Sequence, residues 1–163
     1  MKHMKRVMLT ILLGLLFNTA LIAGARFVRV DVEQDRRVQH AKITIELGSE
    51  NNGDRVFYAK LNTGDLWSVG FLPNIERVID IDKEYFDAIY NKALDLNYRE
   101  IIKGSEGIVG VHGNTTRLTV GTRQNFIELR TWTPFSNLQE RKTEEMYAIF
   151  IELFSLFDME EWL

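Results

Sequence analysis

Residues 26–33 read Arg-Phe-Val-Arg-Val-Asp-Val-Glu, and this stretch decides the fold because apolar and charged side chains alternate along it. From residue 28 onward, the valines point one way and the charged residues between them point the other. A period of two is typical of a strand with one buried and one solvent-facing side. The stretch therefore predicts a β-strand that packs on a core through one face of a sheet.

The same alternation returns in later segments of the chain. Ile43, Ile45 and Leu47 alternate with polar neighbours, and Leu118 and Val120 alternate with an arginine and a threonine. Clusters of turn-forming residues separate such segments at 48–53, 62–65 and 121–125. Further strands are predicted at 56–61, near 66–69 and at 126–132.

Helical spacing of apolar residues occurs in the remaining segments. One helix is predicted to start at Asp80 or Asp82, with an end left open between residues 97 and 103. A last helix is predicted to open at Ser136, which matches a capping box with Gln139. The order of strands, helix, strands, helix predicts the α+β class, a mostly antiparallel sheet with two helices packed on one face. We expect the following side chains in the core: Ile43, Ile45, Ile89, Ile127, Leu129, Phe150 and Leu153.

The N-terminus has the pattern of a secretory signal peptide. Basic residues precede an apolar run over residues 7–17, and Ala23-Gly24-Ala25 offers the small residues that signal peptidase needs. We expect cleavage after Ala25, with residues 1–25 as the signal peptide and 26–163 as a single domain in the periplasm or outside the cell. The alternative is a retained membrane anchor, since residues 7–25 approach the length of about 20 apolar residues that a spanning helix needs.

Charge and composition narrow the classes of partner. Removing the signal takes away three basic and no acidic side chains, so the formal net charge moves from −3 to −6. This balance argues against nucleic acid, whose binding needs a basic surface, and against anionic membrane surfaces. The chain has no cysteine, which excludes thiol catalysis and thiolate metal sites. We expect a protein partner and no membrane embedding after cleavage, and the oligomeric state stays open.

No catalytic or cofactor motif is visible in the sequence. His40 and His112 are the histidines of the expected mature chain, and their spacing does not match a metal site. Carboxylates gather at the start of the first predicted helix, and we interpret them as capping and dipole compensation: Asp80, Asp82, Glu84 and Asp87. The prediction is thus no catalytic residues, no metal and no cofactor.

A candidate binding surface comes from the predicted strand at 126–132. Period-two spacing places Phe126, Glu128, Arg130 and Trp132 on one side of it, and Arg117 lies on the polar side of the preceding strand. If helices cover the other face, these aromatic and arginine side chains lie on an open face, where such residues often dominate binding. The alternative is that Phe126 and Trp132 fold over the ends of the sheet.

A second candidate patch lies in the Gly-containing segment before Pro73. It consists of Trp67, Phe71 and Leu72. Large apolar side chains in such a segment serve either in the core or in an interface, and the sequence favours the core.

The last third of the chain resembles a pattern of uncharacterised small exported bacterial α+β proteins. The resemblance starts at a turn over residues 112–116 that leads into a hairpin, and it continues through Trp132-Thr133-Pro134 to an amphipathic C-terminal helix. In that pattern the turn commonly reads Asp-Gly where this chain has His112-Gly113. The resemblance implies a fold and no activity, so no functional residue is carried over.

These observations favour a small exported protein-binding module over an enzyme. The subtype we expect is an inhibitor or immunity protein against a toxin or a cell-wall enzyme. The alternatives are a small exported hydrolase that uses carboxylates and a structural envelope-assembly factor. Export, small size and acidity are grounds of composition and fold class, which suggest a function only by association.

Overall fold

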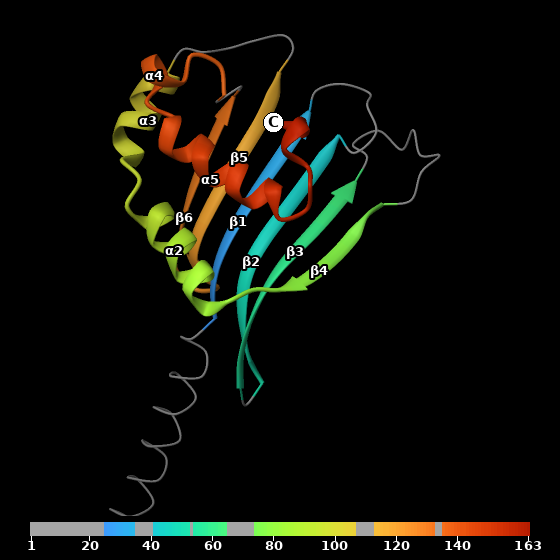
Figure 1. Cartoon of the computed structure of the whole chain (residues 1–163). Coiled ribbons are helices and arrows are strands. Elements are labelled where there is room, and N and C mark those ends of the chain that lie inside the picture. The colour runs from blue at the N-terminus through green and yellow to red at the C-terminus, as the bar shows by residue number, and fades with distance from the viewer. Residues whose placement is uncertain (1–24, 35–40, 53, 65–73, 107–112, 133–134) are drawn as a thin grey trace, which may run out of the picture.

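A computed structural model describes residues 25–34, 41–52, 54–64, 74–106, 113–132 and 135–163. The predicted α+β class is confirmed, because six strands form one antiparallel sheet with helices packed on it (Figure 1). The strands follow one another across the sheet in the order β4-β3-β2-β1-β5-β6. Their bounds are β1 (Arg26–Gln34), β2 (Lys42–Asn52), β3 (Asp54–Gly64), β4 (Glu76–Asp80), β5 (Asn114–Thr122) and β6 (Phe126–Trp132).

The prediction of two helices is not confirmed, because the described residues contain four α-helices. They are α2 (Lys83–Leu94), α3 (Tyr98–Ser105), α4 (Leu138–Arg141) and α5 (Glu144–Ser155), followed by the 3₁₀ turn η1 (Glu160–Trp162). The first predicted helix divides at Asn97, whose side chain accepts a hydrogen bond of 3.3 Å from the backbone N–H of Glu100 and so caps α3. None of the described helices is long and apolar enough to cross a membrane.

The predicted capping box at Ser136 is wrong. The residue at the start of α4 is Asn137, which has a left-handed φ of 54° and no side-chain cap. Lys142 has a second left-handed φ of 56°, so the chain turns again before α5 begins. The chain thus changes direction at Asn137 and again at Lys142, whereas the sequence motif predicted one continuous helix from Ser136.

The strands also differ from the prediction in their extent. Residues 48–52, predicted as a turn, continue β2 and pair with β3 as far as Asn52 and Asp54. β4 was not predicted, because most of its side chains are exposed and its sequence, Glu-Arg-Val-Ile-Asp, has no apolar alternation. The strand predicted near residues 66–69 and the predicted signal peptide, apart from Ala25, lie outside the described residues.

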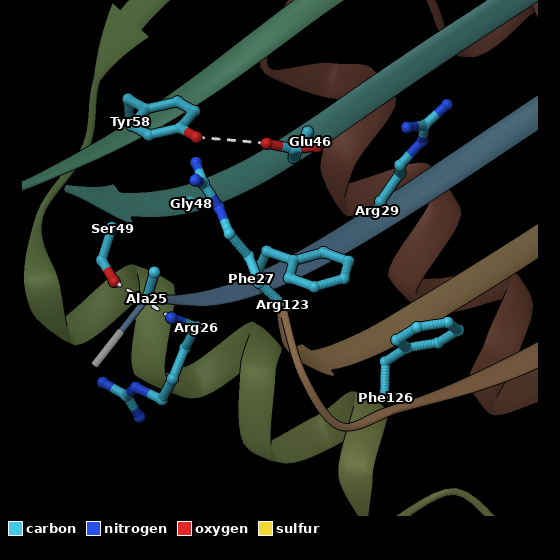
Figure 2. Close-up of a pocket in the computed structure, with 10 residues that line it drawn as sticks. All are labelled: Ala25, Arg26, Phe27, Arg29, Glu46, Gly48, Ser49, Tyr58, Arg123 and Phe126. Atoms are coloured by element: carbon cyan, nitrogen blue, oxygen red, sulfur yellow. Dashed lines mark hydrogen bonds between the residues drawn. The ribbon is translucent and has the colours of Figure 1, made fainter. Parts of the chain in front are cut away.

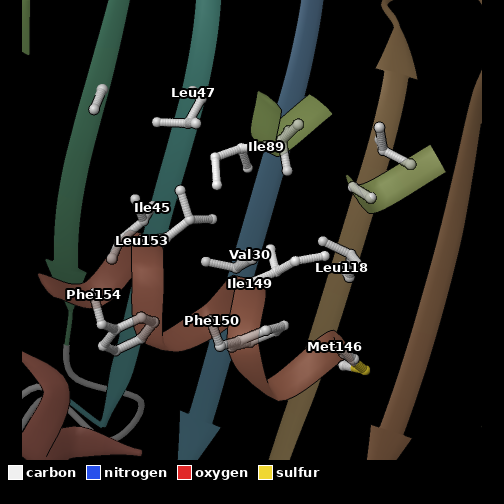
Figure 3. Close-up of a cluster of buried hydrophobic side chains, with 14 of the residues drawn as sticks. Val30, Ile45, Leu47, Ile89, Leu118, Met146, Ile149, Phe150, Leu153 and Phe154 are labelled. Atoms are coloured by element: carbon white, nitrogen blue, oxygen red, sulfur yellow. The ribbon is translucent and has the colours of Figure 1, made fainter. Parts of the chain in front are cut away.

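The core lies between the sheet and the helices on one of its faces. Figure 1 shows α2, α3 and α5 on the same side of the sheet, and Figure 3 shows Ile149 and Phe150 of α5 beside Val30 and Leu118 of the strands. The predicted core is confirmed for Ile43, Ile45, Ile89, Leu129, Phe150 and Leu153, which are all buried.

The prediction is wrong for Ile127, which is 44 % exposed. The alternation places it on the helix-covered face, as expected, because it pairs with the buried Val120. However, β6 is the edge of the sheet. At that edge a side chain has a neighbouring strand on one side only, and burial then depends on a helix directly above it.

Candidate functional site

The open face, defined as the sheet face opposite α2, α3 and α5, carries the candidate site. Antiparallel pairing aligns its residues in rows that cross the sheet. One row, here called the aromatic row, alternates rings and glycines across five neighbouring strands: Tyr58, Gly48, Phe27, Gly121 and Phe126. Strand β1 therefore contributes the ring of Phe27, which lies between the two glycines Gly48 and Gly121.

The glycines of the aromatic row make room for its rings. A Cβ at Gly48 would collide with the ring of Tyr58, which lies across it. Gly121 has a φ of 148°, a conformation that favours glycine, and a Cβ there would collide with the backbone of Phe126. The result is a hollow of about 320 Å³, here called the aromatic hollow, between Tyr58 and Phe126 (Figure 2).

Three arginines line the aromatic hollow and differ in their partners, and one of them, Arg26, forms an ion pair with Asp87 at 2.6 Å. Arg29 donates through Nε and Nη2 to the carboxylate of Asp31, at 3.1 and 2.9 Å, and this hydrogen bond raises the pKa of Arg29. Arg123 forms no hydrogen bond or ion pair with any residue that the structure describes. Figure 2 shows its side chain reaching into the hollow toward Tyr58, whose hydroxyl donates to Glu46 at 3.1 Å. Arg123 is thus the guanidinium of the hollow that is available to an anionic group.

Asp31 is a buried charged residue of the open face. Its side chain is only 4 % exposed, and besides Arg29 it accepts a hydrogen bond of 2.6 Å from the hydroxyl of Thr44. Because its partners lie on its own strand and on the next strand, this network fixes the position of Arg29 beside the hollow. The carboxylate is therefore a positioning group for the arginine.

The structure places all the sequence-predicted site residues on the open face. The pairing of β5 with β6 sets Phe126 opposite Gly121, Glu128 opposite Thr119 and Trp132 opposite Thr115. Phe126 is 56 % exposed and lines the aromatic hollow, whereas Trp132 is half-buried. Spacing within one strand was enough to predict which of these side chains share a face.

Arg117 lies directly opposite Arg130, so two like charges face each other across β5 and β6. Two carboxylates flank this pair: Asp31 lies opposite Arg117 on β1, and Oε1 of Glu128 lies 3.6 Å from Nε of Arg117, too far for a good hydrogen bond. Arg130 is exposed and forms no ion pair or hydrogen bond within the described part of the chain. This part of the open face therefore offers an exposed guanidinium, although the whole chain is acidic.

Sequence reasoning missed several residues of the site, including Phe27, Tyr58 and Arg123. The alternation of residues 26–33 carried a signal for Phe27, since it places Phe27 on the same side as Arg29. Tyr58 and Arg123 gave no such signal, because their positions depend on the pairing of β2 with β3 and on the loop between β5 and β6.

The other candidate groups lie elsewhere. Asp87 pairs with Arg26 at 2.6 Å and with Lys83, and Asp82 stands at the N-cap of α2 without a side-chain hydrogen bond. Asp80 lies directly opposite Tyr58 and lines a second hollow of about 390 Å³, which shares Glu46 and Tyr58 with the aromatic hollow. No group of three or more His, Cys, Asp or Glu in the described segments is arranged to hold a metal ion. The remaining candidates lie outside the described residues: His40, Trp67, Phe71, Leu72 and His112.

The geometry therefore defines one basic and aromatic surface on the open face, without assigning it to a known family. The resemblance in the last third of the chain stays a prediction, because no protein-family model matches the chain and no curated protein gives a significant match.

Proposed function

We propose that this chain is an exported binding module that holds an acidic segment of a protein partner on its open face. The observation that carries the proposal is the cross-strand pair of Arg117 and Arg130. Like charges directly opposite each other destabilise a sheet, so an anionic group placed between them relieves the repulsion. Arginine suits this role because its planar guanidinium donates several hydrogen bonds to carboxylates.

The aromatic hollow supplies apolar contact beside these charges. Tyr58 and Phe126 offer ring surfaces, and Arg123 offers a guanidinium without a partner in the described part of the chain. Aromatic and arginine side chains contribute much of the binding energy at protein interfaces. A partner segment with one large apolar side chain and nearby carboxylates fits both the aromatic hollow and the arginines beside it.

The role that we propose for the module is inhibition of, or immunity to, a toxin or a cell-wall enzyme. The predicted export signal, the small size of the chain and the lack of a catalytic motif in its sequence support this role. A small exported hydrolase and an envelope-assembly factor are the alternatives. Inhibition of a captured enzyme by the purified chain would favour the proposed role, whereas hydrolysis of an envelope polymer would favour the hydrolase.

Capture from a cell-envelope extract, quantified by mass spectrometry after crosslinking, tests the proposal. Arg123→Ala and Arg130→Ala each remove a charge from the open face, whereas Arg99→Ala removes an exposed charge from α3. We expect the open-face variants to capture about tenfold less of the partner, and Arg99→Ala to match the wild type. Capture should also weaken as the salt concentration rises, because salt screens exposed charges.

Equal capture by all three variants and the wild type would overturn the proposal. Trp132→Ala adds a further check, since it should weaken capture with little change in melting temperature. A large fall in its melting temperature would show instead that Trp132 covers the end of the sheet. When the captured partner is an enzyme, the wild-type chain should inhibit it and Arg130→Ala should not. Hydrolysis of an envelope polymer by the purified chain alone would favour the hydrolase alternative.

A further inference from the structure

We propose that two copies of this chain associate through β6, with the two strands antiparallel and Leu129 opposite Leu129 of the second copy. β6 is one edge of the sheet. An edge strand keeps a row of backbone N–H and C=O groups on its free side, and these groups pair readily with another strand. The inference concerns how the chain assembles, and it does not rest on the proposed function.

The sequence of β6 is self-complementary in this register. The strand reads Phe-Ile-Glu-Leu-Arg-Thr-Trp over residues 126–132. A two-fold axis at Leu129 sets Glu128 opposite Arg130 of the second copy, and Phe126 opposite Trp132 of the second copy. Symmetry makes each of these pairs occur twice. Opposite charges and aromatic pairs are the cross-strand partners that stabilise a sheet.

Other positions of the axis remove this complementarity. With the axis at Glu128 or at Arg130, two like charges stand directly opposite each other. With the axis between two neighbouring residues from Ile127 to Arg130, the open face of one copy continues into the helix-covered face of the other, and Glu128 then meets Ile127, Leu129 or Thr131 instead of an arginine. The axis at Leu129 pairs both charges of β6 with their opposites, so charge alone selects the register.

Apolar exposure along the same edge also fits a second copy. Phe126 and Ile127 are 56 % and 44 % exposed, although they are adjacent on β6 and point to opposite faces. Ile102 lies on α3, the helix that contacts β6, and it is 51 % exposed. A strand laid along β6 brings apolar and aromatic neighbours to both faces of this edge.

The association also gives Arg130 a partner, which it lacks among the described residues of its own chain. In the dimer, Arg130 lies between two cross-strand neighbours. One is Arg117 of its own chain, on β5, and the other is Glu128 of the second copy. The six-stranded sheets of the two copies become one continuous sheet. Their open faces then lie on the same side, and each keeps its own aromatic hollow.

Charge reversal tests both the strand and its register. Sedimentation velocity over a series of concentrations should show a dimer for the purified wild type. Glu128→Arg and Arg130→Glu should each weaken the dimer by at least about tenfold, because each sets like charges opposite each other twice. An equimolar mixture of the two variants should restore the dimer, because every pair across the axis is then opposite in charge. The matching control is Arg123→Ala, which should dimerise like the wild type even where it loses the partner of the proposed function.

The absence of cysteine from the chain allows a second test that does not depend on charge. Glu128→Cys mixed with Arg130→Cys should form an intermolecular disulfide, because directly opposite residues come within disulfide range. Either cysteine variant alone should crosslink poorly, since its two cysteines are diagonal neighbours about 7–8 Å apart, beyond the usual Cα separation of a disulfide. A monomeric wild type, charge-reversed variants that still dimerise fully, or a mixture that stays monomeric would each overturn the proposal.

Discussion

The ring of Tyr58 lies over Gly48, its direct partner on the neighbouring strand. A Cβ at position 48 would stand well under 3.0 Å from this ring, so Gly48→Ala must displace it. The displacement also breaks the hydrogen bond of 3.1 Å from the Tyr58 hydroxyl to Glu46. We expect Gly48→Ala to lower the free energy of unfolding by about 1 kcal/mol in chemical denaturation.

Gly64 provides the matched control for this substitution. It lies at the end of β3, and a Cβ there would meet no atom of a described residue within 4 Å. Gly64→Ala should therefore leave stability unchanged or raise it slightly, since alanine restricts the unfolded chain. Equal effects of the two substitutions would show that the contact between Tyr58 and Gly48 does not matter to stability.

Asp87 joins the start of β1 to α2 and should make stability depend on acid. Hydrogen bonds from Lys83 and Arg26 lower the pKa of Asp87 below its ordinary value of 3.8. Arg26 also stacks on Phe86 and Tyr90, with its guanidinium carbon 5.1 and 4.9 Å from the ring centroids. Because the carboxylate is more acidic in the folded state, its contribution is present above pH 3.8 and is lost as the pH falls through the lowered value.

The measurement compares the wild type with Asp87→Asn by thermal unfolding across this range of pH. Asp87→Asn should melt at a lower temperature than the wild type at neutral pH, and the difference should close below pH 3.8. Asp95→Asn is the control on the same helix, since the Asp95 carboxylate forms no ion pair with a described residue. A difference that persists unchanged in acid would show that the carboxylate of Asp87 acts through packing rather than charge.

The sequence predicted the side on which a residue lies better than its neighbours across the sheet. Alternation within 126–132 correctly grouped Phe126 with Arg130, because a period of two depends on one strand alone. The opposition of Arg117 and Arg130 depends on the register between β5 and β6, which the alternation of either strand leaves open. The aromatic row requires four such registers at once and so had no signal in the sequence.

Each missed element has its own physical cause. β4 is an edge strand whose side chains are mostly exposed, so its sequence need not alternate. The start of α4 depends on a left-handed conformation at Asn137, and the break between α4 and α5 depends on another at Lys142, where a lysine gives no sign of such a conformation. Ile127 shows the reverse case, in which an apolar residue with the correct alternation remains exposed because the sheet ends there.

Phe150 and Ile127 should therefore differ sharply when truncated. Phe150 is fully buried and contacts the rings of Phe135 and Phe154 at centroid distances of 5.1 and 6.4 Å. Phe150→Ala should cost about 3–5 kcal/mol of unfolding free energy. Ile127→Ala, measured in dilute solution so that association does not contribute, should cost about 1 kcal/mol or less. Similar losses for the two variants would contradict the burial of the helix face and the exposure of the β6 edge.

At Gly104 of α3, the usual preference of a helix for alanine over glycine should be reversed. Glycine is about 1 kcal/mol less favourable than alanine inside a helix, so Gly104→Ala would ordinarily stabilise α3. However, a Cβ at position 104 would collide with the backbone of Arg141, at the end of α4. Arg141 cannot retreat easily, because it is buried and its Nη2 donates a hydrogen bond of 2.6 Å to the carbonyl of Trp132.

Gly104→Ala should thus lower the free energy of unfolding by about 1–3 kcal/mol, the cost of overpacking. Asn91→Ala, at an exposed position of α2, is the control and should stabilise by a few tenths of a kcal/mol through helix propensity alone. Chemical denaturation of both variants separates the two effects. A gain in stability for Gly104→Ala would mean that α3 does not pack on α4 through Gly104. The hydrogen bond between Arg141 and Trp132 would then hold α4 at the end of β6 without a contribution from Gly104.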